Sequence, residues 1–385
     1  MSAQGIPRFS SREIKRRHRA AERLMEQADV DALLVFGHSG ARRHYQADVY
    51  YLTEVAAFHE SYLLFPRTGE PVLWVTHYNH LASAKEVSAI GDVRRAARRP
   101  VGLLTSELKK RGLAQATLGL VGTFYYQEID GIRGELPGLR LRDLSTEFKL
   151  LRARKSEEEL QFQRIAAGGC DAVMTAVAKE IRAGVEERDL LVLSEEVAWR
   201  SDCTPNFLYL NSTPMRASES CVPNQNISRR KLVMGDVINT ELTVSYGFYS
   251  AQLLRPFFLG EPTPEYARLY DVLKAAHDEL AAVIKPGATA DDIHEASGSI
   301  ERAGYTTVDS VAHGFGIDIL PPNVRSKGFD APPPFVIEKD MTIVIQPNPT
   351  TKDERIGMQL GEMGLVTGSA FVSMHSLPAE VIRCG

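Results

Sequence analysis

Two residues of the chain stand in local settings that suit proton transfer. His313 lies between an alanine and a glycine, small neighbours that let backbone and ligand approach closely. Glu241 lies in the middle of a predicted strand, between the apolar residues Ile238 and Leu242, where a solvated acid is not expected. Histidine titrates near neutral pH, and burial and neighbouring charges can bring a carboxyl into the same range. We therefore interpret His313 and Glu241 as candidate general acid–base catalysts.

Each of these residues also has a purely structural interpretation. His313 could be a satisfied core histidine, and Glu241 could be a buried carboxylate paired with Arg255 or with His313. Cys221 lies in a loop before a proline, but nothing in the sequence pairs it with a histidine or a helix N-terminus. A nucleophilic thiol at Cys221 is therefore not favoured.

The elements that must position these residues fall into two groups. In the first group, short apolar runs at 31–36, 61–65, 71–76 and 116–121 predict strands that alternate with helices. The first helix begins after Ser10, with Glu13 at the capping-box spacing. This alternation predicts an α/β domain at residues 1–152.

The pattern of predicted helices and strands changes after residue 152. Ser156 and Glu159 have the capping-box spacing and predict the start of a long helix that runs to residue 181. Further helices are expected at 187–200, 264–284 and 291–303, and strands at 207–210, 237–245, 247–259 and in the tail after 341. Strands and helices without strict alternation predict an α+β domain at 153–385.

Composition limits the classes of function. The 385 residues carry 45 Lys+Arg against 49 Asp+Glu, a formal net charge of −4, which disfavours a strongly basic nucleic-acid binder. No apolar run approaches the roughly 18–20 residues that span a bilayer, and the first residues have no apolar signal-peptide core. The four cysteines are far apart and are expected to be reduced thiols. A cytoplasmic protein without a nucleic-acid or membrane partner is expected.

Several segments, taken together and in order, resemble the creatinase/aminopeptidase P superfamily, which has the pita-bread fold. They are 155–160 (KSEEEL), 235–238 (GDVI), 284–288 (IKPGA), 312–316 (AHGFG), 346–347 (QP) and 365–367 (LVT). The resemblance runs through nearly the whole chain, because residues 1–152 look like the smaller N-terminal domain of creatinase and prolidase. It implies a pita-bread domain at 153–385 and a homodimer.

The resemblance also implies where a metal would sit. Members of this superfamily often hold two metal ions on two Asp, one His and two Glu. The corresponding positions here are Glu241, Gln252, His313, Gln346 and Gly361. Only one of the four anionic ligands remains. The positive charge of a dinuclear metal cluster would therefore be left largely uncompensated. We expect no metal cofactor, and far less than one divalent metal per purified chain. Glu362 lies beside the lost ligand, but alternation along a strand predicts that it points away.

The same resemblance suggests which residues contact substrate. Gln252 and Gln346 would orient a polar substrate, or alternatively fill the vacated site by bonding one another. Asn224 occupies the position of creatinase's catalytic histidine, and Arg325 lies near its carboxylate-binding arginine, although an exposed loop cation beside a lysine is the plainer interpretation. Tyr249 is a weaker candidate, more typical of a core or rim aromatic.

A further implied contact comes from the N-terminal domain. Residues 58–60 occupy the position of the loop that reaches across the creatinase dimer. Phe58 and Glu60 would then line the partner's site, where an acid favours a cationic or hydrogen-donating group.

Three classes of function remain open. The leading hypothesis is a metal-independent, creatinase-like hydrolase that cleaves a C–N bond, amide or amidine, in a small polar molecule, with His313 and Glu241 transferring protons. The second is a catalytically silent pita-bread protein that binds a ligand. The third is a mononuclear, metal-dependent hydrolase or lyase resembling Xaa-Pro peptidases, ligated by Glu241, His313 and one or both glutamines.

Overall fold

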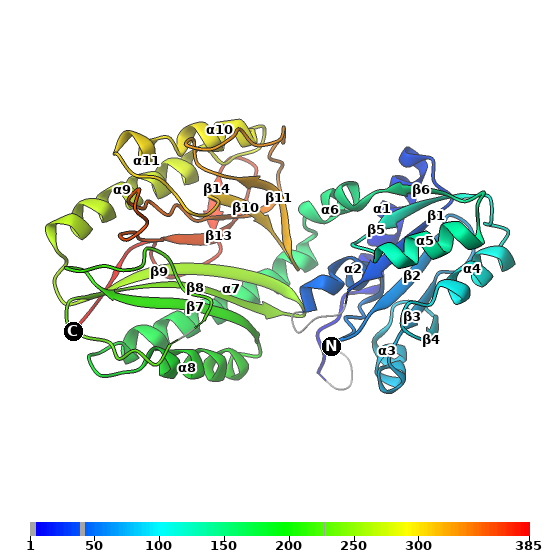
Figure 1. Ribbon diagram of the computed structural model, residues 1–385, viewed down its shortest axis with the longest axis horizontal. Coiled ribbons are helices and arrows are strands. Elements are labelled where there is room, and N and C mark those ends of the chain that lie inside the picture. The colour runs from blue at the N-terminus through cyan, green and yellow to red at the C-terminus, as the bar shows by residue number, and fades with distance from the viewer. Residues whose placement is uncertain (1–4, 39–42, 227) are drawn as a thin grey trace. The chain divides into compact units, whose positions relative to one another are not determined.

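The computed structural model describes residues 5–38, 43–226 and 228–385 (Figure 1). The chain forms two compact units, Met1–Arg152 and Ala153–Gly385. In the described part of the chain, no helix is long and apolar enough to cross a membrane.

A mixed sheet forms the centre of the first unit. Its strands lie in the order β4-β3-β2-β1-β5-β6. Strands β1 and β2 and strands β2 and β3 pair antiparallel, and the remaining neighbours pair parallel. The strands are β1 (Ala32–Gly37), β2 (Ser61–Pro66), β3 (Val72–Val75), β4 (Asp92–Arg95), β5 (Thr117–Val121) and β6 (Arg140–Asp143).

Helices cover both faces of this sheet. One face packs against α1 (Ser11–Ala28), α2 (Ala47–Thr53), α3 (Leu81–Val87) and α6 (Ser145–Ala153), and the other against α4 (Val101–Lys110) and α5 (Tyr126–Glu135). Two buried layers explain why the strands are apolar on both sides. The α/β prediction for this region is confirmed.

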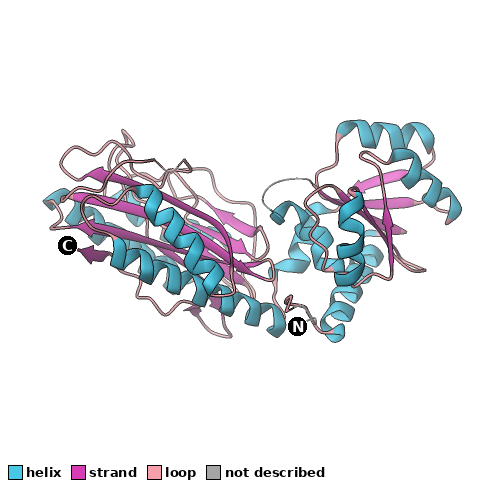
Figure 2. Ribbon diagram, turned by 90° about the horizontal axis from the view of Figure 1, so that it is seen from below, coloured by secondary structure: helices cyan, strands magenta, loops and turns pink. Residues whose placement is uncertain are grey.

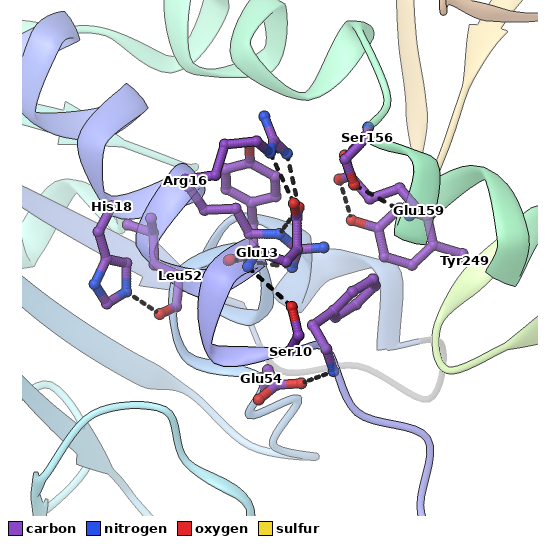
Figure 3. Close-up of polar contacts among 12 residues, drawn as sticks. Ser10, Glu13, Arg16, His18, Leu52, Glu54, Ser156, Glu159 and Tyr249 are labelled. Atoms are coloured by element: carbon purple, nitrogen blue, oxygen red, sulfur yellow. Dashed lines mark hydrogen bonds and ion pairs between the residues drawn. The ribbon is translucent and has the colours of Figure 1, made fainter. Parts of the chain in front are cut away.

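The first helix begins as its sequence indicates. Ser10 is the N-cap of α1, and its hydroxyl accepts a hydrogen bond from the backbone N–H of Glu13 at 3.2 Å. The Glu13 carboxylate binds Arg16 and Arg17 (Figure 3 shows Glu13 and Arg16). Arg17 is fully buried, with its guanidinium 3.8 Å from the ring centroid of Phe9. Arg17 is therefore part of the core of the first unit.

A long, largely antiparallel sheet runs through the second unit (Figure 2). Its strands lie in the order β11-β10-β12-β13-β9-β8-β7, with β14 beside β13 and β15 beside β9. The bounds are β7 (Thr204–Pro214), β8 (Asp236–Tyr246), β9 (Tyr249–Leu259), β10 (Ala312–Phe315), β11 (Ile319–Val324), β12 (Thr342–Ile345), β13 (Gly361–Val366), β14 (Phe371–Ser373) and β15 (Ile382–Cys384).

Two groups of helices pack on this sheet. Helices α7 (Glu157–Glu180) and α8 (Glu187–Arg200) bury their apolar residues against β7, β8 and β9. Helices α9 (Pro264–Val283), α10 (Ala290–Ala296) and α11 (Ser299–Arg302) lie over the other part of the sheet. The α+β prediction for 153–385 is confirmed. The expected helix at 291–303 is wrong in one respect: it breaks at residues 297–298, where the Ser297 hydroxyl donates to the carbonyl of His294.

The start of α7 is the predicted capping box. The hydroxyl of Ser156 accepts from the N–H of Glu159, and a Glu159 oxygen accepts from the N–H of Ser156 at 2.7 Å. The second Glu159 oxygen accepts the hydroxyl of Tyr249 at 2.6 Å (Figure 3). One carboxylate therefore ties the first turn of α7 to the first residue of β9.

Candidate active site

The register of the sheet places Glu241, Gly361 and Gln346 in one row. Tyr209 of β7 lies opposite Glu241 of β8, Glu241 opposite Leu254 of β9, and Leu254 opposite Gly361 of β13. Residues directly opposite in antiparallel strands share a face of the sheet. Gln346, just after β12, packs against Gly361 and extends the row.

A second row runs beside the first. Phe207 lies opposite Thr243, and Thr243 lies opposite Gln252. Gln252 is thus the diagonal neighbour of Glu241, within reach of a long side chain. Its Nε2 donates to Glu241 Oε1 at 2.8 Å. Residues that are eleven apart in sequence are brought together because β8 and β9 form a hairpin.

Glu241 has an unusual electrostatic environment. The residue keeps partial solvent exposure, but the surrounding protein desolvates its carboxyl. Desolvation first, and then the negative charge of Asp309, raise the pKa of Glu241 to about 8. Glu241 therefore carries a proton over most of the neutral range and can donate it.

His313 is also buried, and its environment acts in the opposite direction. Its Nδ1 lies 3.0 Å from the main-chain carbonyl of Gly314, so Nδ1 carries the proton of the neutral ring and Nε2 keeps its lone pair. Burial lowers the pKa of His313, against opposing effects of the Gly314 carbonyl, Asp309 and Gln346. His313 is therefore neutral at pH 7 and can accept a proton.

The loop before β10 completes the site. Gln346 Nε2 donates to Asp309 Oδ2 and to the carbonyl and hydroxyl of Ser310, each at 3.3 Å. Asn348, which is fully buried, holds the loop, because its Oδ1 accepts the backbone N–H groups of Val308 and Asp309 at 2.9 and 3.0 Å. The Asp309 carboxylate is thereby fixed at an exposed edge of the cluster.

The lost ligand at position 361 is replaced by close packing. A Cβ built on Gly361 would lie 2.3 Å from the carbonyl oxygen of Ile345 and 2.8 Å from the Cα of Gln346. Its neighbour Glu362 points to the other side, as predicted, and binds Arg255 at 2.6 Å. Arg255 is thus the partner of Glu362 and not of Glu241, which corrects one structural interpretation of Glu241.

Comparisons with known proteins identify the family of this chain. Residues 161–368, more than half of the chain, match the model of metallopeptidase family M24, and residues 17–154 match the creatinase/prolidase N-terminal domain. The chain belongs to metallopeptidase family M24. The predicted resemblance and pita-bread fold are confirmed.

Individual M24 relatives are distant. An Xaa-Pro dipeptidase from Pyrococcus furiosus is 25% identical over 236 residues, which span 60% of this chain and 66% of that protein. The crystal structure of prolidase from Pyrococcus horikoshii has a TM-score of 0.80 at 21% identity and covers 95% of this chain and 100% of that one. Dipeptidase PepE from Mycobacterium ulcerans has a TM-score of 0.82 at 22% identity, covering 98% and 99%. These structures support the fold.

The donor set of this M24 chain does not fit the two-metal centre that the resemblance implies. No three His, Cys, Asp or Glu side chains of the described residues lie together as a potential metal site. Of the five matching positions, only Glu241 can be anionic, and it favours its protonated form. Gln252 and Gln346 offer neutral amide oxygens, and position 361 has no side chain. A cluster of charge +4 would be left uncompensated.

Two predicted substrate-binding residues have other roles in the structure. The Tyr249 hydroxyl is engaged by Glu159, and Tyr249 is only 2% exposed, so it supports α7 and does not face a substrate. Asn224 is exposed in its loop, where its Oδ1 accepts the N–H of Asn226 at 2.8 Å in a local turn. The Asn224 prediction rests on the position of a family residue, whereas the Tyr249 prediction does not.

Three further predicted residues, Arg325, Glu60 and Phe58, have separate outcomes. Arg325 is exposed, and its guanidinium stacks on Phe329, 3.4 Å from the ring centroid, as expected of a loop cation. Glu60 is buried and bound to Arg98 at 3.0 Å, and its contact with a ligand of the partner stays a prediction. Phe58 is 47% exposed, which leaves its predicted role untested.

Sequence reasoning missed Asp309, Ser310 and Asn348. Each lies within four residues of His313 or Gln346, so proximity in sequence was the available signal. None has a position in the ligand set of the family resemblance, and only the fold shows that their polar groups turn toward Gln346.

Proposed function

We propose that this M24 chain hydrolyses an amide-type C–N bond in a small polar or peptide-like molecule, with Glu241 and His313 transferring protons. Two groups at family ligand positions carry the proposal: the Glu241 carboxyl, which is hydrogen-bonded to Gln252, and the His313 imidazole, which is hydrogen-bonded to the Gly314 carbonyl. Their pKa values are displaced in opposite directions from the usual ones, which is how environments separate an acid from a base.

The proton transfers follow from which atoms carry protons. Neutral His313 accepts a proton at Nε2 from the attacking water as its oxygen bonds to the carbonyl carbon. Protonated Glu241 donates to the leaving nitrogen as the C–N bond breaks. The resulting carboxylate and imidazolium return to their starting states by net transfer of one proton between them. Each positioned acid or base accelerates the reaction by about 10²–10⁴-fold.

The test is turnover of a panel of dipeptides, amides and amidines, with and without chelator. Glu241→Gln and His313→Ala should each reduce turnover by about 10²–10⁴-fold. The exposed Glu380 gives the matched control Glu380→Gln, which should leave the rate unchanged. Activity of folded His313→Ala within about twofold of wild type would end the acid–base assignment and favour a silent binding protein.

The rate should also depend on pH in a defined way. Because Glu241 must be protonated, the rate should fall as pH rises through about 8. This alkaline limb should be absent from the residual activity of Glu241→Gln. If the alkaline limb persists in the Glu241→Gln variant, another titrating group causes the fall in rate.

One observation favours a second candidate, a mononuclear metal-dependent peptidase. The distant relatives include proteins named Xaa-Pro dipeptidase, and Glu241, His313 and the amide oxygens could hold one cation. Metal analysis of the purified protein separates the two functions. We expect far less than one divalent ion per chain. One or more equivalents that resist dialysis, with activity abolished by chelator, would replace the proposal by this candidate.

A further inference from the structure

A buried carboxylate outside the row of site residues takes no part in the proposed proton transfers. Glu187, the first helical residue of α8, is only 4% exposed and forms no ion pair with any described residue. Its Oε1 accepts the N–H and the hydroxyl of Ser212, both at 2.7 Å. Its Oε2 accepts the N–H and the hydroxyl of Ser228, at 3.3 and 2.5 Å. One side chain therefore accepts four hydrogen bonds from two separate segments.

The surroundings of Glu187 stabilise a carboxylate without a counter-ion. A buried carboxylate is costly unless hydrogen bonds replace those that it loses to water. The first turn of a helix also contributes, because its free N–H groups carry partial positive charge. Hydrogen bonds to a carboxylate are roughly twice as strong as those between neutral groups. Glu187 therefore holds the end of β7, at Ser212, and the loop after β7, at Ser228, firmly against the start of α8.

The loop between β7 and β8 is anchored on both sides of residues 221–226, which we name the rim segment. Before the rim segment, the hydroxyl of Ser218 donates to the main-chain carbonyl of Arg355 at 2.7 Å. After the rim segment, Ser228 is bound to Glu187 through both its N–H and its hydroxyl. Removing the Glu187 carboxylate would therefore release one of the two anchors.

The rim segment borders the candidate active site through two main-chain carbonyls. The carbonyl of Cys221 accepts Nδ2 of Asn239 at 3.5 Å, and Asn239 shares a face of β8 with Glu241 because it lies two residues before it. The carbonyl of Asn224 accepts the N–H of Leu210, on β7, at 3.3 Å. Both distances are long for hydrogen bonds, so these contacts are weak. The position of the rim segment therefore depends on its anchors.

We propose that Glu187 is a positioning residue for substrate binding, which holds the rim segment in place at the border of the site. The inference rests on the proposed function for the reaction that the site performs. Glu187 acts only through Ser228 and the rim segment, and it does not contact Glu241 or His313. A wall that is already ordered lowers the entropic cost of binding. Loss of the carboxylate should therefore weaken substrate binding and leave the proton transfers intact.

Hydrogen exchange of the full-length protein tests the anchoring step without any substrate. Glu187→Ala should speed amide exchange in the rim segment by at least about tenfold, because one anchor is lost. Exchange at residues 230–232 should change by less than about twofold, since the N–H of Leu232 donates to the carbonyl of Val185 at 2.8 Å whatever the side chain at 187. Glu195→Ala makes the same change at an exposed residue of α8 and should alter neither region.

Steady-state kinetics on the best substrate of the wild type tests the binding step. Glu187→Ala should raise KM by about tenfold and leave kcat within about twofold, the pattern of lost binding without lost chemistry. Ser228→Ala, at an exposed residue that keeps its N–H, should raise KM by about two- to threefold. Because both changes break the same contact, the double variant should resemble Glu187→Ala. Glu187→Gln keeps one acceptor oxygen and should restore part of the binding.

Specific results would overturn the inference. These are unchanged exchange in the rim segment of Glu187→Ala, equally faster exchange throughout residues 153–385, a fall in kcat as large as the rise in KM, or additive effects in the double variant. If Glu187→Ala does not fold, Ser228→Ala decides, and an unchanged KM refutes the inference. Absence of hydrolysis together with faster exchange confined to the rim segment would count against the proposed function alone. Hydrolysis with an unchanged KM in Glu187→Ala would count against this inference alone.

Discussion

Asp309 and Glu241 show how one residue sets the chemistry of another. Asp309 is exposed and is fixed by Gln346 and Asn348, and its charge helps keep the proton on Glu241. Burial of the Glu241 carboxyl, and then this charge, favour its acid form. An amide at position 252 can hold the carboxyl without ionising it, which an aspartate could not.

The raised pKa of Glu241 predicts a pH-dependent stability difference. The folded state holds the Glu241 proton up to about pH 8, whereas an unfolded glutamate loses it near 4.5. The stability of the wild type relative to Glu241→Gln should therefore fall as pH rises from about 4.5 to about 8, by at most about 5 kcal/mol. Urea unfolding in the presence of chelator at several pH values measures it. A difference that does not vary with pH would show that Glu241 is ionised in the fold.

Arg255 and Glu362 predict a large penalty for breaking one buried ion pair. Their side chains are 0% and 6% exposed, and Arg255 also binds the carbonyls of Gly361 and Leu377. Glu362→Ala should lower the free energy of unfolding by about 3–5 kcal/mol, because it leaves a buried cation unpaired.

The matched comparisons use a surface pair and a double variant. Glu261 and Arg383 form an exposed pair at 3.5 Å, so Glu261→Ala should cost less than about 1 kcal/mol. Replacing Arg255 by Met and Glu362 by Leu together should recover much of the loss. A Glu362→Ala protein as stable as Glu261→Ala would contradict the argument.

At the scale of elements, the close approach of β12 and β13 depends on a glycine. Because any Cβ at Gly361 would overlap the backbone around Gln346, Gly361→Ala should lower the free energy of unfolding by about 1–3 kcal/mol or more. Gly368, in the turn between β13 and β14, has no heavy atom within 4 Å of a built Cβ. Gly368→Ala should therefore change stability by less than about 0.5 kcal/mol.

Chemical denaturation of the two glycine variants checks this prediction. Equal stability of both would show that β12 and β13 can separate without cost. Restoring a glutamate ligand at position 361 would then be feasible by substitution alone, whereas the present packing requires the two strands to move apart.

At the scale of the whole molecule, we predict a homodimer in which the N-terminal domain of one chain borders the other chain's site. Phe58 and Tyr78 are 47% and 71% exposed, so they offer apolar surface to a partner. Between them in sequence, the ring of His59 stacks on that of His77 with centroids 4.7 Å apart. Sedimentation at micromolar concentration should show a dimer that Phe58→Asp weakens. Tyr126→Asp, at a residue 77% exposed, is the control. A wild-type monomer would contradict the prediction.

The sequence by itself determined the structural class of each domain and the positions of most elements. It also determined that the metal-ligand positions have lost most of their carboxylates. These follow from apolar periodicity, capping residues such as Ser156 and the identities at 252, 346 and 361, which need no knowledge of distant contacts. Only the tertiary structure decided that Asp309 reaches Gln346, that Glu60 is bound to Arg98 and that Tyr249 supports α7. Each of these depends on a contact between residues that strand register and loop closure bring together, and a single position's residue type does not encode its partner.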